Sequence, residues 1–452
     1  MTNAADKPIP TAADPARLCE LAQSHPRPEG APERSDVSMR LFRKREDDAE
    51  IEAGKAFHIT RGDWSYILDA DYIRKVKKLG WSFQGTMNGV TRNAEHAMKD
   101  KDGKPRLDHF KKPGRYWADM RNEAYRKWYV DRLVAWVEAG ADSIQRDEPT
   151  TCKRTPIPVA AKFFQDVHER FRKRVGERVP MSCNLAWNRS RFGGRGRPVA
   201  KQFDFGMAEF YRKHLKPETL MSAAQDAERR GKALIYTGGA HMSRQEVRLA
   251  IAGCYANGMN YIVPWDQFTG VGKPRLFGEP EDFADLYGFV RAVAGYLDGY
   301  EAAASWIPAA LREKEAGQKL PGGRRAAADD SPFFVPPGTG RGRLCIFARA
   351  RPDRADAPVV LHLVEWGGQP KPATLALRPE AFFGDRELRV ALLTPPPYDQ
   401  AAHEKAEAEK NYTPLATRAK LEVTPTDGLA RVSVPALRPW GILIVSPAAR
   451  DE

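Results

Sequence analysis

The chain has 452 residues, of which 42% are hydrophobic and 10% aromatic, which excludes a disordered or fibrous protein. A single core seldom serves so long a chain, so the length predicts two domains. With 72 Lys and Arg against 59 Asp and Glu, the net charge of +13 favours anionic partners over neutral ones without identifying any.

Residues 1–50 contain six prolines among charged residues and no apolar segment of the kind that a signal peptide carries. We expect a partly ordered N-terminal arm over these residues. No apolar run approaches the ~18 residues of a membrane helix, so no membrane partner is expected. The expected location is the cytoplasm, or the periplasm or exterior if a leader has been removed.

Between Phe57 and about Tyr300, short apolar runs alternate with amphipathic stretches that close near a glycine, the pattern of repeated βα units. Asn122 begins one expected helix, and Ser243 with Glu246 begins another as a capping box. Residues 91–114 are polar and loop-like where a second helix would be expected. Eight such units in about 250 residues predict a (β/α)8 TIM barrel over 51–311. The expected strands are 57–60, 81–85, 115–119, 141–147, 179–184, 203–209, 233–237 and 260–265.

Residues 312–343 are rich in glycine and proline, and we expect them to form a linker. Apolar runs separated by Pro and Gly turns follow, with one charged helical insert at 401–411. We therefore predict a C-terminal antiparallel β-sandwich over 344–452. Its expected strands are 344–348, 359–365, 373–377, 388–393, 421–423, 430–434 and 441–445.

The predicted fourth barrel strand ends in two adjacent acids, Asp147 and Glu148, directly before Pro149. Active sites of (β/α)8 barrels are built at the carboxyl ends of the strands, so both acids are candidate catalytic residues. The spacing Gly-x-Asp-x-Ile-x-x-Asp over residues 140–147 resembles retaining glycoside hydrolases of the α-amylase and α-galactosidase/α-glucosidase type. This resemblance implies that Asp147 is the nucleophile.

The pair Glu148-Pro149 is also similar to the Asn-Glu-Pro of another group of glycosidases, in which the Glu is the acid/base. Asp147 stands here in the place of that Asn. The segments 360–366 and 437–445 are similar to the closing β-domains of many glycosidases. Taken over residues 55–450, the resemblance implies a glycosidase that cleaves a poly- or oligosaccharide.

A glycosidase needs a second carboxyl group as its proton donor. Glu209, at the end of the predicted sixth strand, is the first candidate, Asp266 after the eighth strand is the second, and Glu148 is the third. In the mechanism that the resemblance implies, Asp147 attacks the anomeric carbon, or together with Glu148 stabilises the oxocarbenium-like state. Carboxyl groups about 5 Å apart would mean retention of the anomeric configuration, and about 6.5–9.5 Å inversion; the sequence leaves both open.

Other predicted strand ends carry residue types that bind sugars. Aromatic rings cover the apolar C–H faces of a sugar, whereas Asp, Asn, Arg and His bind its hydroxyl groups. We therefore expect substrate contacts from the residues at or beside these ends. They are Arg61, Asp63, Trp64, Trp117, Asp119, Arg146, Asn184, Trp187, Tyr236, His241 and Trp265.

The segment after the predicted fifth strand, residues 188–201, carries four Arg and one Lys and no acid. Guanidinium groups bind carboxylates and sulfates in a bidentate manner, so an anionic substrate, uronate-containing or sulfated, is a hypothesis. Two alternatives stay open. One is a barrel enzyme for a phosphorylated metabolite, bound at Gly238-Gly239 or 270–273. The other is a non-catalytic protein that binds polysaccharide or polyanions, although carboxylates in the predicted cleft make nucleic acid a poor partner.

The cysteines and histidines predict neither a disulfide framework nor a metal site. The five Cys are odd in number and widely spaced, and the nine His include no pair at metal-ligand spacing. We expect no cofactor and no catalytic transition metal. Oligomeric state, the sugar and the linkage are left undecided by the sequence.

Overall fold

The computed structural model describes residues 17–41, 47–151, 153–176, 178–184, 196–210, 212–238, 242–265, 278–312, 331–337, 343–367, 370–384 and 386–448. Contacts divide the chain into two compact units. The barrel unit comprises 25–298 with 395–417, and the sandwich unit comprises 1–24, 299–394 and 418–452. None of the helices in the described ranges is both long and apolar enough to cross a bilayer.

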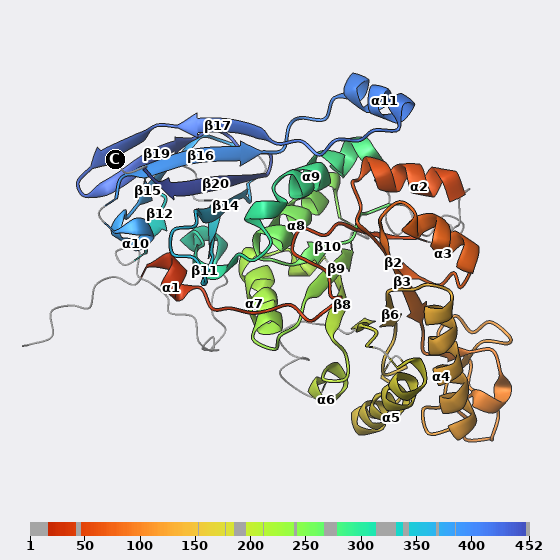
Figure 1. The fold of residues 1–452 in the computed structure, drawn as a ribbon. Coiled ribbons are helices and arrows are strands. Elements are labelled where there is room, and N and C mark those ends of the chain that lie inside the picture. The colour runs from red at the N-terminus through yellow and green to blue at the C-terminus, as the bar shows by residue number, and fades with distance from the viewer. Residues whose placement is uncertain are drawn as a thin grey trace, which may run out of the picture. The chain divides into compact units, whose positions relative to one another are not determined.

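The barrel unit is built on one parallel eight-stranded sheet (Figure 1). A parallel bridge between Met39 and Val263 brings the last strand back to the first and closes the sheet into a barrel. This confirms the predicted fold class. In barrel order the strands are β1 (Ser38–Arg40), β2 (Arg61–Ser65), β3 (Ser82–Met87), β6 (Ser143–Arg146), β7 (Met181–Asn184), β8 (Phe205–Phe210), β9 (Leu234–Gly238) and β10 (Asn260–Tyr261).

The expected strands miss one barrel strand and include one that lies outside the barrel, so the count of eight holds. The expected strand at 57–60 also ends before β2, which begins at Arg61. Residues 38–40, which we expected in an N-terminal arm, form the first barrel strand. The predicted strand at 115–119 lies outside the barrel, where β5 (Tyr116–Trp117) pairs antiparallel with β4 (Val90–Thr91). A three-residue strand with polar ends lacks the apolar run by which strands are recognised, since Ser38 and Arg40 are buried polar residues.

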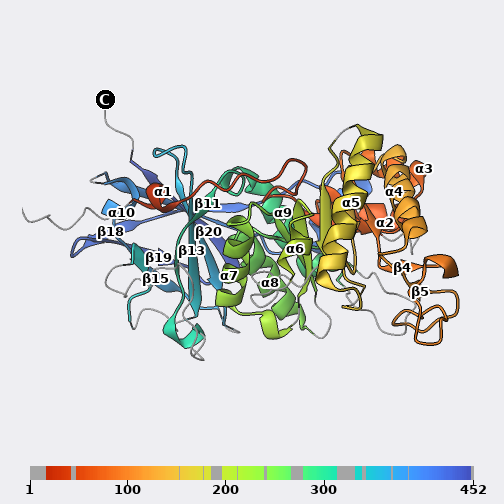
Figure 2. The ribbon, with the colours of Figure 1, turned by 90° about the horizontal axis from the view of Figure 1, so that it is seen from below.

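Helices connect the barrel strands, and their sequences explain where they begin. The Asn122 side chain accepts a hydrogen bond from Tyr125 N at the start of α4, and Ser243 with Glu246 forms the expected capping box of α8. Figure 2 shows α4 and α5 side by side. The helices of this unit are α2 (Asp47–Ala56), α3 (Ala70–Lys77), α4 (Glu123–Glu138), α5 (Ile157–Val175), α6 (Arg197–Ala200), α7 (Pro217–Glu228), α8 (Arg244–Ala256), α9 (Pro280–Ala292) and α11 (Gln400–Glu409).

Residues 88–122, which we call the β3–α4 excursion, are inserted between β3 and the barrel helix α4, and they contain β4, β5 and a short 3-10 helix, η1 (Ala94–His96). Polar composition correctly indicated loop structure here. Since the excursion leaves from the carboxyl end of β3, it lies at the same end of the barrel as the end of β6.

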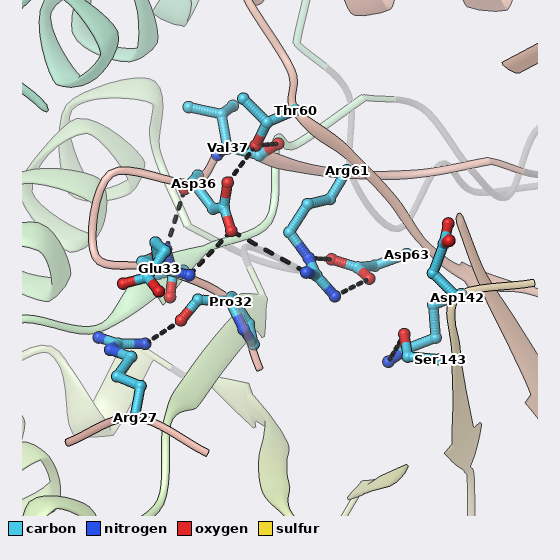
Figure 3. A network of polar contacts seen from close by, with 12 residues as sticks. Arg27, Pro32, Glu33, Asp36, Val37, Thr60, Arg61, Asp63, Asp142 and Ser143 are labelled. Carbon is cyan, nitrogen blue, oxygen red and sulfur yellow. Dashed lines mark hydrogen bonds and ion pairs between the residues drawn. The ribbon is translucent and has the colours of Figure 1, made fainter. Parts of the chain in front are cut away.

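The amino end of the barrel carries a buried network of polar contacts (Figure 3). Asp36 Oδ1 accepts a hydrogen bond from Thr60 Oγ1 at 2.7 Å, and Asp36 Oδ2 lies 3.9 Å from Arg61 Nη1. Arg61 Nε in turn donates to Asp63 Oδ2 at 3.1 Å. Arg61 is therefore held by two carboxylates at the end of the barrel away from the carboxyl ends of the strands.

The sandwich unit consists of two antiparallel sheets, as predicted, and its core lies between them. Leu361, Leu443 and Val432 are fully buried there. One sheet has the order β11-β13-β14-β20-β16-β17, from β11 (Glu301–Trp306), β13 (Leu344–Ala350), β14 (Val359–Glu365), β20 (Trp440–Pro447), β16 (Leu388–Thr394) and β17 (Thr417–Leu421). The other has the order β12-β15-β19-β18, from β12 (Phe333–Phe334), β15 (Ala373–Leu377), β19 (Leu429–Val434) and β18 (Val423–Thr426).

The sandwich unit begins earlier in the chain than residue 344. β11 pairs with β13, although its sequence was assigned to the barrel, and β12 lies within the expected linker. Most of the remaining linker lies outside the described residues. Two short helices, α1 (Leu18–Leu21) and α10 (Glu380–Phe383), also belong to this unit.

Candidate active site

Alternation along the barrel strands identifies which side chains point into the barrel. Gln145 Nε2 lies 3.2 Å from Met207 Sδ, so these two residues of β6 and β8 meet inside it. Asp147 lies two residues after Gln145, and Glu209 lies two residues after Met207. Because side chains alternate along a strand, both point to the same side as those residues, one layer nearer the carboxyl ends of the strands. Both are half-buried. The fourth and sixth strands thus present one carboxyl group each at the end where barrel enzymes hold their substrates.

Donors surround the carboxyl group of Asp147. Tyr66 Oη donates to Oδ2 at 2.5 Å, and Asn184 Nδ2 donates to Oδ1 at 2.9 Å. The backbone N–H of Glu148 donates to Oδ1 at 3.0 Å. Charge-assisted hydrogen bonds of this kind are the strong ones, and together they fix the carboxyl plane. Asn184 was among the expected substrate ligands; the structure makes it a partner of Asp147.

Tyr66, which the sequence analysis missed, comes from the end of β2. The register of β2 against β3 shifts between Gly62 and Ser65, and Trp64 adopts a positive φ of 55°. This bulge directs the Trp64 indole inwards, where Nε1 donates to Tyr66 Oη at 3.3 Å. Burial, and after it the charge of Asp147, raise the pKa of Tyr66 well above its usual range, so the phenol stays protonated and donates.

Arg40, from the end of β1, is a second residue that the sequence analysis did not single out. Its guanidinium carbon lies 3.8 Å from the centroid of the Trp64 ring and 5.8 Å from that of Tyr66. The buried cation therefore stacks on the rings that support Asp147. Finding it would have required recognising residues 38–40 as a strand.

Glu148 turns away from the barrel axis. Its φ of 51° lies in the left-handed region, and its Oε1 lies 3.5 Å from Nδ1 of His109 in the β3–α4 excursion. Asp147 and Glu148, adjacent in the chain, therefore have different surroundings: the first faces the barrel interior and the second contacts the excursion.

Two of the expected substrate ligands lie on the outward side of their strands. Arg146 is 1% exposed, and its guanidinium carbon packs 5.2 Å from the centroid of the Tyr129 ring of α4. Tyr236 is also buried, on the face of β9 opposite to Ile235, which belongs to the barrel's inner cluster. Both sit one residue out of phase with the inward positions, so their side chains point away from the barrel interior.

Arg61 and Asp63 lie nearer the amino end of the barrel than expected. We expected them just after a strand at 57–60, but β2 begins at Arg61, which puts both in the buried network at the amino end. Trp117 and Asp119 belong to the β3–α4 excursion, where Trp117 is fully buried and Asp119 half-buried.

Trp64 lies inside the barrel beside Tyr66, as described above, whereas Trp265 is 6% exposed and packs edge-on against Phe57. The candidates Trp187, His241 and Asp266, the arginines at 189–195 and the glycine segments at 239 and 270–273 lie outside the described residues. Within the described ranges, no three or more His, Cys, Asp or Glu side chains gather as a metal site would require. A small cavity lined by Arg34, Glu228 and Lys232 lies at the amino end of the barrel, away from Asp147.

Comparison with solved structures identifies the fold as that of α-amylases. A noncanonic maltogenic α-amylase, AmyB, from Thermotoga neapolitana matches 92% of this chain and 99% of its own, with a TM-score of 0.55 and 10% identity. A debranching enzyme from Nostoc punctiforme matches 93% and 100%, with a TM-score of 0.51 and 10% identity. An α-amylase from Lactobacillus plantarum matches 91% and 99%, with a TM-score of 0.50 and 11% identity.

At such low identity the likeness establishes a shared fold, a (β/α)8 barrel with β-sheets after it. No protein-family model and no curated relative matches the sequence. Function therefore has to be argued from the site itself.

Proposed function

We propose that this protein is a glycoside hydrolase that cleaves a poly- or oligosaccharide with Asp147 and Glu209. The observation that carries the proposal is the set of donors on Asp147, which holds a carboxyl group rigidly at the end of the fourth strand. A nucleophile must be fixed within reach of the reacting carbon, and hydrogen bonds to both oxygens achieve this. The α-amylase-type fold and the strand-four motif support the same reading.

The proposed reaction has two displacement steps. Asp147 attacks the anomeric carbon, an ester bond to Asp147 forms, the glycosidic C–O bond breaks, and Glu209 gives its proton to the leaving oxygen. Water then attacks the same carbon, Glu209 takes the proton of that water, and the ester bond breaks to free Asp147. Tyr66 and Asn184 keep their hydrogen bonds to Asp147 and so stabilise its carboxylate as the leaving group of the second step.

An anionic polysaccharide, uronate-containing or sulfated, is the substrate class that we propose. The net charge is +13, and the β3–α4 excursion carries nine Lys and Arg against five Asp and Glu near the end of β6. A cationic surface beside the barrel mouth attracts polyanionic chains and raises their rate of association.

Release of reducing ends from neutral, uronate-containing and sulfated polysaccharides tests this proposal. We expect the purified protein to cleave at least one of the anionic glycans, and more slowly as salt is added, because salt screens the attraction. Cleavage confined to neutral glycans would contradict the substrate class, and no cleavage across the panel would contradict the hydrolase.

Replacing Tyr66 by Phe should lower kcat about 10- to 100-fold with little change in KM. The reason is that a hydrogen bond to a charged group contributes about 1.5–3 kcal/mol, and this one stabilises the carboxylate as it departs. Tyr72→Phe is the matched control, because buried Tyr72 also donates to a carboxylate, Glu50 Oε2, at 2.6 Å. The control should lower the melting temperature and leave kcat unchanged; equal losses of kcat in both variants would refute the role of Tyr66.

A further inference from the structure

The tip of the β3–α4 excursion presents an exposed aromatic ring. Phe110 is 55% exposed, and its ring centroid lies 4.0 Å from that of His109. The guanidinium carbon of Arg115 lies 5.2 Å from the Phe110 centroid. The ring is therefore open to contact from a ligand and has a cation at its side.

The chain around this ring is held rigidly. Asp108 is 3% exposed; its Oδ1 accepts from Phe110 N at 3.0 Å and its Oδ2 from Arg115 Nε at 2.8 Å. Lys111 adopts a φ of 53°, a conformation that costs free energy in a residue with a side chain. One buried carboxylate thus fixes the backbone of Phe110 and the guanidinium of Arg115, which is the preorganisation expected of a binding surface.

The excursion is also tied to the strand that ends in Asp147. His109 Nδ1 lies 3.5 Å from Glu148 Oε1. A Cβ atom on Gly89 would come within 3.1 Å of the Glu148 carbonyl oxygen and 3.3 Å of Thr151 Cγ2, so the start of the excursion packs closely on the chain after Asp147. His109 therefore lies between Phe110 and Glu148, the residue that follows Asp147.

The charges beside the ring select the kind of ligand. Lys111 and Lys112 are exposed next to Phe110, and Arg115 is partly exposed. A ring binds the C–H face of a sugar, whereas ammonium and guanidinium groups bind carboxylate or sulfate. A neutral sugar would use the ring and not the ammonium groups of Lys111 and Lys112, and a small anion would use the cations and not the ring.

We propose that Phe110, Lys111 and Arg115 form a subsite that binds one anionic sugar unit of a polysaccharide chain beyond the bond that is cleaved. The inference deepens the proposed function and rests on it for the position of the cleaved bond. Binding itself does not require hydrolysis, so the two can be tested apart.

The test is calorimetric titration of the full chain carrying Asp147→Asn with a galacturonate hexamer, a heparin-derived hexamer and maltohexaose. We expect Phe110→Ala to weaken binding of an anionic hexamer about 5- to 10-fold, the range of one stacked ring. Phe110→Tyr keeps the ring and should bind as the parent does. Leu415→Ala is the matched control, because Leu415 is exposed to a similar extent, 57%, outside the excursion.

An affinity that Phe110→Ala leaves unchanged would overturn the subsite, as would equal binding of maltohexaose or no binding of either anionic hexamer. Ring-dependent binding without any hydrolysis by the wild type would keep the subsite and overturn the proposed function instead. The two failures are therefore distinguishable.

Discussion

Replacing Asp147 by Asn should reduce hydrolysis at least about 1,000-fold, because the amide cannot form the ester with the anomeric carbon. The substitution preserves the volume of the side chain at a half-buried position, and its carbonyl oxygen can still accept from Tyr66. The fold should therefore survive. Initial rates on the best polysaccharide, with melting temperatures measured in parallel, provide the check.

Asp142→Asn is the matched control for this experiment, because Asp142 lies just before the same strand at the other end of the barrel. Its Oδ2 accepts from Phe83 N at 2.8 Å and its Oδ1 pairs with Lys77 at 2.7 Å. Asp142→Asn should change the melting temperature and leave the initial rate of hydrolysis unchanged. An Asp147→Asn enzyme that kept a tenth of the wild-type rate would show that Asp147 is not the nucleophile.

Glu209→Ala should lower the rate of polysaccharide hydrolysis about 100- to 10,000-fold, because the leaving oxygen of a polysaccharide has to be protonated. The first step should be nearly unimpaired for aryl glycosides with acidic phenols, since these leave as anions without help. The loss should therefore grow with the pKa of the leaving group, as pre-steady-state rates over a series of aryl glycosides would measure.

Glu246→Gln serves as the control for Glu209, because Glu246 caps α8 and pairs with Arg212, away from the barrel interior. It should alter stability alone. A loss in Glu209→Ala that is the same for every leaving group would mean that Glu209 positions the substrate and does not transfer the proton.

The fold could be predicted from the sequence because each barrel strand with an apolar run leaves a local pattern. The helix starts at Asn122 and Ser243 were predicted correctly, since a cap is a local hydrogen bond. β1 could not be predicted in this way. Ser38 and Arg40 are buried in the barrel although they are polar, and their burial depends on strands far along the chain.

The inward position of the candidate residues could be predicted only where strand ends were placed correctly. Asp147 directly follows β6 and Glu209 lies near the end of β8; the ends of both strands were predicted within a residue, and both side chains face inwards. Arg146 and Tyr236, which face outwards, were selected because an assignment to the strand end that ignores the alternation of side chains picks the outward neighbour as readily as the inward residue. Arg61 and Asp63 lie nearer the amino end than expected because β2 begins later than predicted.

Tyr66 shows what a single sequence does not reveal. Its contact with Asp147 joins residues 81 positions apart, and it depends on the bulge that turns Trp64 inwards. Trp is not a residue for which a positive φ would be expected, so no local signal indicated the bulge.

The anomeric configuration of the first product tests most directly whether Asp147 acts as a nucleophile. It can be followed by proton NMR in the first minutes of hydrolysis, before mutarotation mixes the anomers. Two displacements at one carbon restore its configuration, so the account predicts a product with the same anomeric configuration as the bond cleaved. A product of opposite configuration would mean a single displacement by water, and would contradict an ester on Asp147.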